Sequence, residues 1–158
     1  MLLETALMCM THNIYHEAKN QSMLGQIAVA QVVMNRVASP LFPNTICEVV
    51  KQGQRYKNGK MVLHRCQFSW YCDGKKDDIN RNTKEWQSAL GYATIVMSGK
   101  ITLDVTQGSL WYHAYYVKPS WAKQKEKVTR IDSHIFYRRK NDRLSFRFIC
   151  ISVCGNKQ

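Results

Sequence analysis

The chain has 158 residues, of which 45% are hydrophobic and 11% aromatic, and its 23 Lys and Arg against 11 Asp and Glu give a formal net charge of +12. This composition argues against a disordered chain, and the lack of any apolar run of about 18 residues predicts no stable membrane insertion. Because a chain of this length buries enough surface to fold alone, we expect one domain over residues 1–158. Its positive charge should attract nucleic acid, anionic lipid or acidic wall polymers.

The N-terminus lacks the features of an export signal. Met1-Leu2-Leu3-Glu4 has neither a basic stretch before an apolar segment nor a small-residue cleavage site, which predicts synthesis in a cytoplasm without a signal peptide. Cysteines are usually reduced in that setting, and no CxxC pair is present. We therefore predict reduced thiols rather than a disulfide framework for Cys9, Cys47, Cys66, Cys72, Cys150 and Cys154.

The first predicted helix spans residues 2–18 and ends in an acid on its apolar face. At steps of three and four residues, this face carries Leu3, Leu7, Met10, Ile14 and Glu17. Glu17 should lose water there, which disfavours its charged form and raises its pKa. A carboxyl group of this kind can give and take a proton near neutral pH, as acid–base catalysis requires. The alternative is that Glu17 meets solvent or a basic partner at the helix end.

The next two predicted helices have clear start and stop signals. Ser22 is expected to cap a helix that is apolar almost all round and therefore buried, and Ser39-Pro40 ends it. Thr45-x-x-Glu48 forms a capping box that opens a short helix over residues 46–51.

The second half of the chain is predicted to mix irregular segments with one more helix and two strands. Asn58-Gly59 indicates a hairpin within residues 52–82. Asn82-x-x-Glu85 resembles a capping box for a helix that stops at Gly99. Two segments read as extended, residues 110–117 and 144–153. The whole pattern predicts an α+β domain that is mainly helical.

His12 and His16 stand four residues apart on the first helix, a spacing at which two imidazoles can bind one metal ion. Zinc peptidase helices place the general base directly after the first His, but that position is Asn13 here, and no third ligand is evident. A metal-dependent hydrolase is therefore kept only as an alternative, and no metal ligand or cofactor is assigned.

Aromatic residues with polar neighbours gather in two segments, Gln67-Phe68-Ser69-Trp70 and residues 111–121. Flat rings beside fixed hydrogen-bonding groups suit sugars, whose C–H faces stack on rings. The same rings also suit a protein core or, among positive charges, the bases of single-stranded nucleic acid. A basic nucleic-acid-binding module without catalysis therefore stays open as an alternative.

Several segments together resemble the SleB-type cell wall hydrolases, which include spore cortex-lytic enzymes and many bacteriophage lysins. The matching segments span about residues 3–137 and leave residues 138–158 as a basic C-terminal extension. They are Ile14-Tyr15-His16-Glu17-Ala18, Gly25-Gln26-Ile27-Ala28-Val29-Ala30, Val33-Met34-Asn35-Arg36-Val37, Phe42-Pro43-Asn44-Thr45-Ile46-Cys47-Glu48-Val49, Gln67-Phe68-Ser69-Trp70, Trp111-Tyr112-His113-Ala114, Pro119-x-Trp121-Ala122 and His134-x-Phe136-Tyr137.

The resemblance implies a lysozyme-like fold related to goose-type lytic transglycosylases, with Glu17 as the single catalytic acid. The implied reaction cleaves the bond between N-acetylmuramic acid and N-acetylglucosamine in peptidoglycan and closes a 1,6-anhydro ring without consuming water. A hydrolytic muramidase acting on the same bond is the nearest alternative. Together with their polar and aromatic character, the matched motifs predict that the substrate is bound by Gln67, Phe68, Ser69, Trp70, Tyr112, His113, Trp121 and Tyr137. Of these, Gln67, Ser69 and Tyr137 are expected beside Glu17.

The chain also departs from the family pattern around the glutamate. That pattern reads Gly-Glu-Ala-Arg-Gly-Glu, whereas this chain has His16 before Glu17 and no second acid at position 21. We expect a monomeric phage lysin, made in the host cytoplasm, that acts on peptidoglycan strands of the wall or periplasm. Since it lacks a signal, it should depend on a holin-like membrane-permeabilising partner, and no specific nucleic acid is expected.

Overall fold

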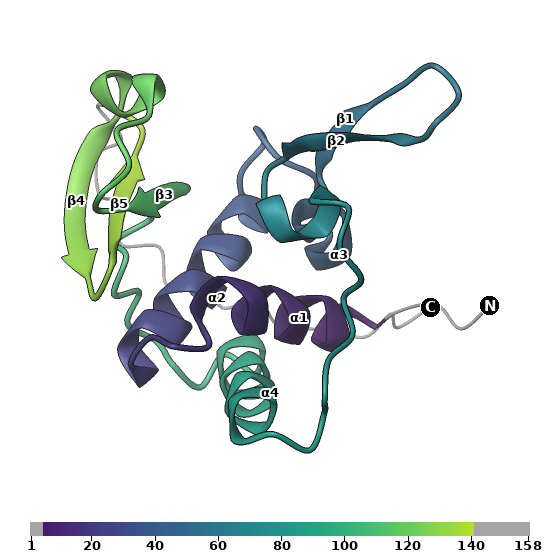
Figure 1. Ribbon diagram of the computed structural model, residues 1–158. Coiled ribbons are helices and arrows are strands. Elements are labelled where there is room, and N and C mark those ends of the chain that lie inside the picture. Colours follow the sequence, from purple (N-terminus) through teal and green to yellow (C-terminus); the bar gives the residue numbers. More distant parts are fainter. Residues whose placement is uncertain (1–4, 141–158) are drawn as a thin grey trace, which may run out of the picture.

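The computed structural model describes residues 5–140, and every structural statement below refers to this range. Four α-helices, two 3₁₀ helices and five strands form a mainly helical α+β domain (Figure 1). In chain order they are α1 (Ala6–Ala18), α2 (Met23–Ala38), α3 (Ile46–Val50), β1 (Gly53–Arg55), β2 (Met61–Cys66), η1 (Ser69–Cys72), α4 (Lys84–Met97), β3 (Trp111–Ala114), η2 (Ser120–Gln124), β4 (Glu126–Ile131) and β5 (His134–Arg138).

A side-chain hydroxyl caps the start of each α-helix. Thr5, Ser22, Thr45 and Thr83 each accept a hydrogen bond from the backbone N–H three residues further on. The caps at Ser22 and Thr45 confirm the sequence prediction. The predicted cap at Asn82 is wrong by one residue, because it is the Thr83 hydroxyl that accepts from the N–H of Trp86. The first helix begins at Ala6, since Thr5 is already extended.

Helix α2 lies at the centre of the molecule, as its all-round apolar sequence predicts. All residues from Gly25 to Val33 are buried. Helices α1, α3 and α4 pack around it, and their shared core includes Met10, Ile14, Ala30, Val49 and Ala93. Fully buried aliphatic side chains of this kind are the main favourable term in folding. The core therefore fixes the end of α1, where Glu17 is located.

Two small antiparallel sheets flank the helices on different sides (Figure 1). Strands β1 and β2 form the predicted hairpin around Asn58-Gly59, with Gly59 at a φ of 82°. The second sheet has the order β3-β5-β4. Its Ile131 and Phe136 pack on Ala28 and Val32 of α2. Strands β4 and β5 were not predicted, and the strand predicted over residues 144–153 lies outside the described residues.

Two disulfides contradict the prediction of reduced thiols. Cys9 of α1 is bonded to Cys47 of α3, and Cys66 of β2 to Cys72 of η1. The prediction was wrong because it rested on redox compartment and on the local spacing of the cysteines, whereas packing brings the Cα atoms of Cys9 and Cys47 to 5.2 Å. The other two cysteines lie outside the described residues.

Between residues 5 and 140, no helix has both the length and the apolar character that crossing a membrane requires.

Candidate active site

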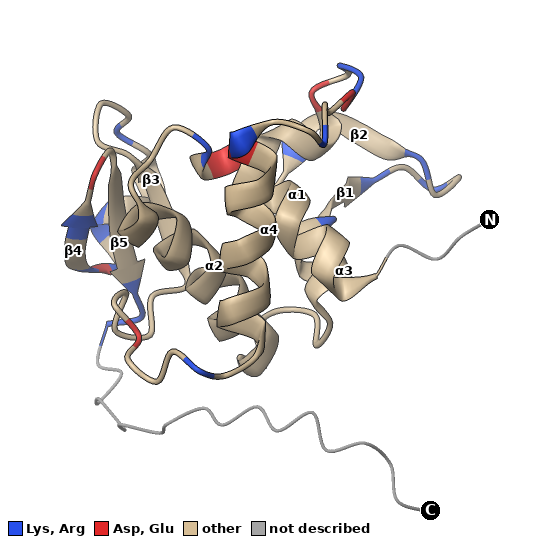
Figure 2. Cartoon of the chain, turned by 90° about the horizontal axis from the view of Figure 1, so that it is seen from below, with Lys and Arg blue, Asp and Glu red and all other residues tan. Residues whose placement is uncertain are grey.

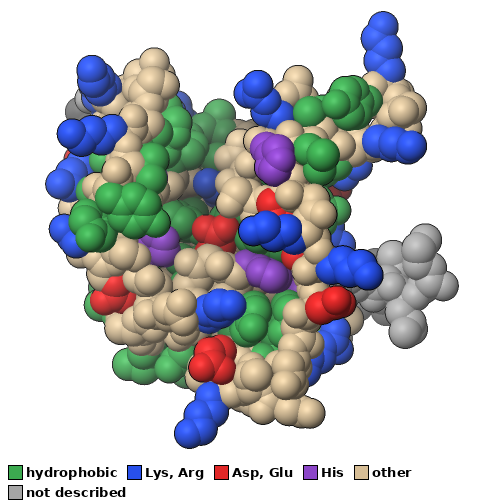
Figure 3. All heavy atoms as spheres, viewed as in Figure 1, with side chains coloured by type: hydrophobic (Ala, Val, Ile, Leu, Met, Phe, Trp, Pro, Cys, Tyr) green, Lys and Arg blue, Asp and Glu red, His purple; other side chains and the backbone are tan. Residues whose placement is uncertain are grey.

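Glu17 lies in the last turn of α1 and is hydrogen-bonded to a residue of β3. The phenol of Tyr112 donates a hydrogen bond to Oε2 of Glu17 over 2.9 Å. The Glu17 side chain is partly buried. Figure 3 shows the surface hollowed between the side of the three-stranded sheet and the side of the hairpin, with acidic and histidine side chains in and beside the hollow.

The environment of Glu17 favours a proton-holding carboxyl group, as its place on the apolar stripe predicts. Burial raises the pKa of Glu17 above its usual value, while the Tyr112 hydrogen bond and the charge of Arg36 partly oppose that rise. Burial also raises the pKa of Tyr112, so this phenol remains a hydrogen-bond donor. A carboxyl group held in this way can release a proton and take it back.

Arg36 is a component of the site that the sequence analysis did not select. Its side chain is only 4% exposed and lies against the rings of Phe42 and Phe68, each 5.0 Å from the guanidinium carbon. Its Nε donates to the carbonyl oxygen of Leu110 over 2.7 Å, and its buried Nη1 has no hydrogen-bond partner. Burial lowers the pKa of Arg36 to about 10, while Tyr112 and Glu17 favour its charged form. A basic residue inside an almost wholly apolar helix is the sequence signal that could have found it.

Trp70, a predicted substrate-binding residue, is held against α1. Its indole N–H donates to Oδ1 of Asn13 over 3.1 Å, and its ring stacks on His16 at a centroid distance of 4.4 Å. Asn13 is fully buried and lies one helical turn before Glu17. Burial lowers the pKa of His16, and Nε2 of His16 is 3.8 Å from Oδ1 of Asp77. Trp70 of η1 therefore packs against α1, the helix that carries the candidate acid.

The other residues of the Gln67-Phe68-Ser69-Trp70 segment divide between core and surface. Phe68 is 2% exposed, and its ring centroid lies 6.5 Å from that of Tyr112, so it belongs to the core next to the site. Gln67 and Ser69 are exposed. The backbone N–H of Gln67 donates to the carbonyl oxygen of Gln52.

The remaining predicted residues gather on the other face of the sheet. Tyr137 pairs with Trp111 across the ladder, whereas Tyr112 pairs with Phe136, so Tyr137 and Tyr112 point to opposite faces. The Tyr137 hydroxyl lies 3.0 Å from Nε2 of His113. Trp121 packs edge-on against both rings. The structure thus joins His113, Trp121 and Tyr137 to one another and does not bring them to Glu17.

His12 and His16 take part in aromatic packing. His12 lies edge-on to Trp86 at 5.1 Å, and His16 stacks on Trp70. Among residues 5–140 no group of three or more His, Cys, Asp or Glu side chains is arranged so that it could hold a metal ion.

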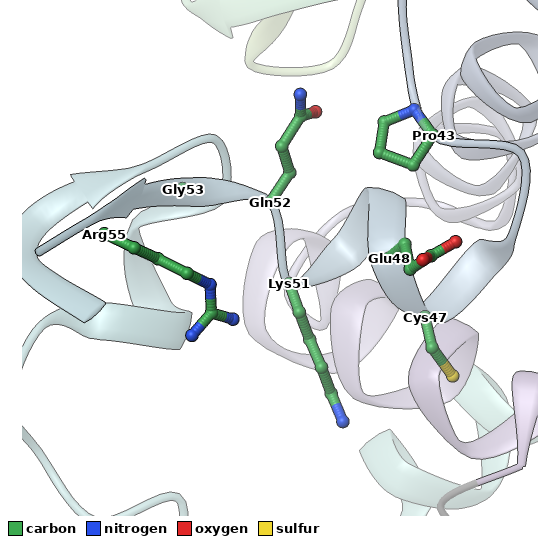
Figure 4. A pocket seen from close by; sticks show the side chains of 7 residues that line it. All are labelled: Pro43, Cys47, Glu48, Lys51, Gln52, Gly53 and Arg55. Carbon is green, nitrogen blue, oxygen red and sulfur yellow. The ribbon is translucent and has the colours of Figure 1, made fainter. Parts of the chain in front are cut away.

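A separate hollow of about 410 Å³ lies between α3 and the start of the hairpin (Figure 4). It is lined by Pro43, Cys47, Glu48, Lys51, Gln52, Gly53 and Arg55. None of the predicted site residues lines this hollow, so it is distinct from the surroundings of Glu17.

Comparison with known sequences identifies related proteins. A family described as Cell Wall Hydrolase has a sequence model that matches residues 20–137, a range that begins just after Glu17. The spore cortex-lytic enzyme of Bacillus cereus is 46% identical over 41 residues, which make up 26% of this chain and 16% of that protein. The spore cortex-lytic enzyme of Bacillus subtilis is 46% identical over 37 residues, 23% of this chain and 12% of that protein. The matched segments thus span a small part of each relative.

Two solved structures share the fold. The catalytic domain of the Bacillus cereus SleB protein superposes with a TM-score of 0.62 at 25% identity, covering 84% of this chain and 89% of that domain. The catalytic domain of the germination-specific lytic transglycosylase SleB from Bacillus anthracis has a TM-score of 0.59 at 23% identity, covering 87% and 97%. The predicted lysozyme-like fold class and the resemblance to SleB-type proteins are confirmed.

Proposed function

Since the chain belongs to the cell wall hydrolase family, whose sequence model covers residues 20–137, we propose that it degrades peptidoglycan as a lytic transglycosylase with Glu17 as its acid and base. The bond cleaved is the glycosidic bond between N-acetylmuramic acid and N-acetylglucosamine. One observation carries the proposal. A carboxyl group with a raised pKa is held by Tyr112 beside a buried cation, Arg36.

In the first step, Glu17 donates its proton to the leaving glycosidic oxygen as the bond from that oxygen to the muramic C1 breaks. The muramic C6 hydroxyl then attacks C1, and its proton passes to the Glu17 carboxylate. The product is a 1,6-anhydro sugar, no water is consumed, and Glu17 ends in its starting protonation state. The Tyr112 phenol keeps the carboxyl group oriented, and the positive charge of Arg36 favours its ionised form between the two proton transfers.

The surroundings of Glu17 favour this reaction over a hydrolysis that uses two carboxylates. Such glycosidases place two carboxyl groups roughly 5–9.5 Å apart, and each then disfavours ionisation of the other. Within the described part of the chain, the groups that shift the pKa of Glu17 are Tyr112 and Arg36, with no second acid among them. The C6 hydroxyl of the substrate supplies the nucleophile that a second carboxylate would otherwise provide or activate.

Mass spectrometry of the products from purified peptidoglycan tests the reaction type directly. The proposal expects muropeptides that end in 1,6-anhydro-N-acetylmuramic acid. Reducing ends, each heavier by one water, would instead establish a hydrolytic muramidase. A loss of cleavage on addition of a chelator would establish a metal-dependent enzyme.

The biological role within the proposal is that of a monomeric bacteriophage endolysin, which reaches the wall after a holin-like partner has permeabilised the inner membrane. Its support is the positive charge, which favours association with an anionic wall. Turbidity of Gram-negative cells should fall on addition of the protein when both membranes have been permeabilised and stay constant when they are intact. Binding to single-stranded DNA without any lysis would support the nucleic-acid-binding alternative.

A further inference from the structure

Among the described residues, Lys and Arg outnumber Asp and Glu most strongly in residues 111–140, which contain the three-stranded sheet. Residues 111–140 contain eight Lys and Arg against two acids, Glu126 and Asp132, whereas residues 5–110 contain twelve against seven. Both acids of the sheet region are engaged. Glu126 accepts two hydrogen bonds from Arg138, and Asp132 accepts from the backbone and hydroxyl of Ser22. The excess of cations is therefore not neutralised locally, and Figure 2 shows Lys and Arg positions along β4 and near the ends of β5.

The register of the sheet places two rows of side chains, each containing one Lys or Arg, on the face that points away from α2. One row crosses the strands as Trp111, Tyr137 and Lys127, and the other as His113, Ile135 and Arg130. Lys127 and Arg130 are exposed. Because Phe136 lies on the opposite face and packs on α2, the two rows lie on the face away from α2, where Trp121 packs against His113 and Tyr137.

Cations on this face are already held over aromatic rings. Nζ of Lys125 lies 3.8 Å from the centroid of the Trp111 ring, and the guanidinium of Arg130 lies 4.3 Å from that of Tyr115. Beside them Tyr115, Tyr116 and Val117 are 51%, 74% and 44% exposed. We call the surface formed by Trp111, Tyr115, Tyr116, Lys125, Lys127 and Arg130 the basic aromatic face.

We propose that the basic aromatic face is a second, non-catalytic binding site for the peptidoglycan strand, and this inference rests on the function proposed above. Peptidoglycan combines the two chemistries that the face can recognise. Its sugar rings present C–H faces to aromatic side chains, and its peptide stems carry carboxylates that complement Lys127 and Arg130. The face lies on the side of the sheet opposite to Tyr112, the hydrogen-bond partner of Glu17, so a strand bound there leaves Glu17 free to act on another segment. A second contact raises the effective concentration of substrate at Glu17.

A charge-reversal experiment with a matched control tests this proposal. The test protein is Lys127→Glu with Arg130→Glu, and the control is Lys84→Glu with Lys100→Glu, whose lysines are exposed near the two ends of α4. Both pairs lower the net charge equally, so only the location differs. Both are made in a Glu17→Gln background, and their sedimentation with insoluble peptidoglycan is measured at low salt. Catalysis is not needed for this readout, which therefore judges the second site even if the proposed reaction fails.

We expect the test protein to bind about tenfold more weakly than the parent and to lose most of the salt dependence, because exposed charges act over a Debye length of about 10 Å at 0.1 M salt. The control should bind within about twofold of the parent, and Lys127→Arg, which keeps the positive charge, should bind like the parent. In the active background, cleavage of short soluble muropeptides should be unchanged by the charge reversal.

Three results would overturn the proposal. The first is equal weakening by the test and control pairs, which would show that only net charge matters. The second is an equal loss of activity on soluble muropeptides, which would place the face in the catalytic machinery. The third is unchanged peptidoglycan binding with a loss of binding to phosphatidylglycerol vesicles or single-stranded DNA, which would assign the face to a lipid or nucleic-acid partner.

Discussion

The phenol of Tyr112 and the carboxylate of Glu17 join the middle of β3 to the end of α1 across 95 residues of sequence. Tyr112→Phe would remove this hydrogen bond and keep the ring packing against Phe136 and His134. The hydrogen bond stabilises the ionised carboxylate, so its loss should raise the pKa of Glu17 further. The acid form is then retained to higher pH, and the alkaline limb of the pH–activity profile should move upward. We also expect turnover to fall about tenfold as the carboxyl group loses its orientation.

The control for Tyr112→Phe is Tyr15→Phe, which removes a phenol from α1, the helix of Glu17, while its ring continues to pack against the core. This variant should leave the alkaline limb in place. A Tyr112→Phe protein whose limb coincides with that of the wild type would show that the phenol does not act on Glu17.

Replacement of Glu17 by glutamine should abolish catalysis with little effect on folding. The amide is nearly isosteric and can still accept the Tyr112 hydrogen bond, but it cannot transfer a proton. We expect at least about 10²-fold lower lysis, the low end of acid–base contributions, together with a melting temperature close to that of the wild type. Glu85→Gln, at an exposed acid in the first turn of α4, should retain full activity. Lysis at the wild-type rate by the Glu17 variant would refute the assignment.

The pH dependence of the wild type follows from the direction of the Glu17 shift. Because its folded-state pKa lies above the usual carboxyl value, the proton is held at pH values where an ordinary glutamate has already ionised. Acid catalysis should therefore persist at mildly acidic pH and decline as pH rises through the raised pKa. Initial rates on purified peptidoglycan between about pH 4 and 9, at constant ionic strength, measure this decline. A rate that was still rising at pH 8 would contradict a proton-donating Glu17.

Arg36 should limit the pKa of Glu17, because its charge favours the carboxylate. Arg36→Met removes the charge and keeps an apolar side chain between Phe42 and Phe68, so the pKa of Glu17 should rise. Arg36→Lys should remain close to the wild type. Carboxyl ¹³C NMR titration of Glu17 measures this shift independently of activity. A matched control is Gln31→Met, which leaves the carbonyl of Leu103 and the N–H of Val105 unpaired at a cost of about 1–3 kcal/mol. This control should lower stability without moving the pKa of Glu17.

Gln67 is expected to contact the substrate through its exposed side chain. Gln67→Ala should reduce turnover more than tenfold while the melting temperature changes little, since an exposed side chain contributes little to folding. Gln54 is also an exposed glutamine and lies in β1, so Gln54→Ala should change neither turnover nor melting temperature. A large drop in melting temperature with normal turnover per folded molecule would make Gln67 a structural residue.

The helical half of the fold could be predicted from sequence because its signals are local. Caps such as Ser22 and Thr45 and the apolar face of α1 act within one or two turns, and a single chain displays them directly. The partly buried position of Glu17 and the direction of its pKa shift follow from the same local pattern. Strands β4 and β5 were missed because charges interrupt the alternation in Glu126–Ile131 and a register shift lies between Lys127 and Thr129.

The partners of Glu17 could not be predicted because they depend on tertiary packing. Nothing near Tyr112 in the sequence distinguishes its phenol from that of Tyr115 or Tyr116, and only the register of β3 turns it toward α1. Arg36 escaped notice because a basic side chain is normally assigned to solvent. The same dependence on register separates Tyr137 from Tyr112, although both came from matched motifs.

The disulfide between Cys9 and Cys47 also determines how much of the chain must be kept together. Cys9 and Glu17 both precede residue 20, where the family match begins, and Cys47 lies within the matched range. In the loop-entropy account, a disulfide across a sequence separation of 38 raises the free energy of unfolding by about 4 kcal/mol, because it restricts the unfolded chain. A fragment that began at residue 20 would therefore lack α1, and with it both the proposed acid and the disulfide partner of Cys47. A fragment used to test the proposed reaction must therefore include α1.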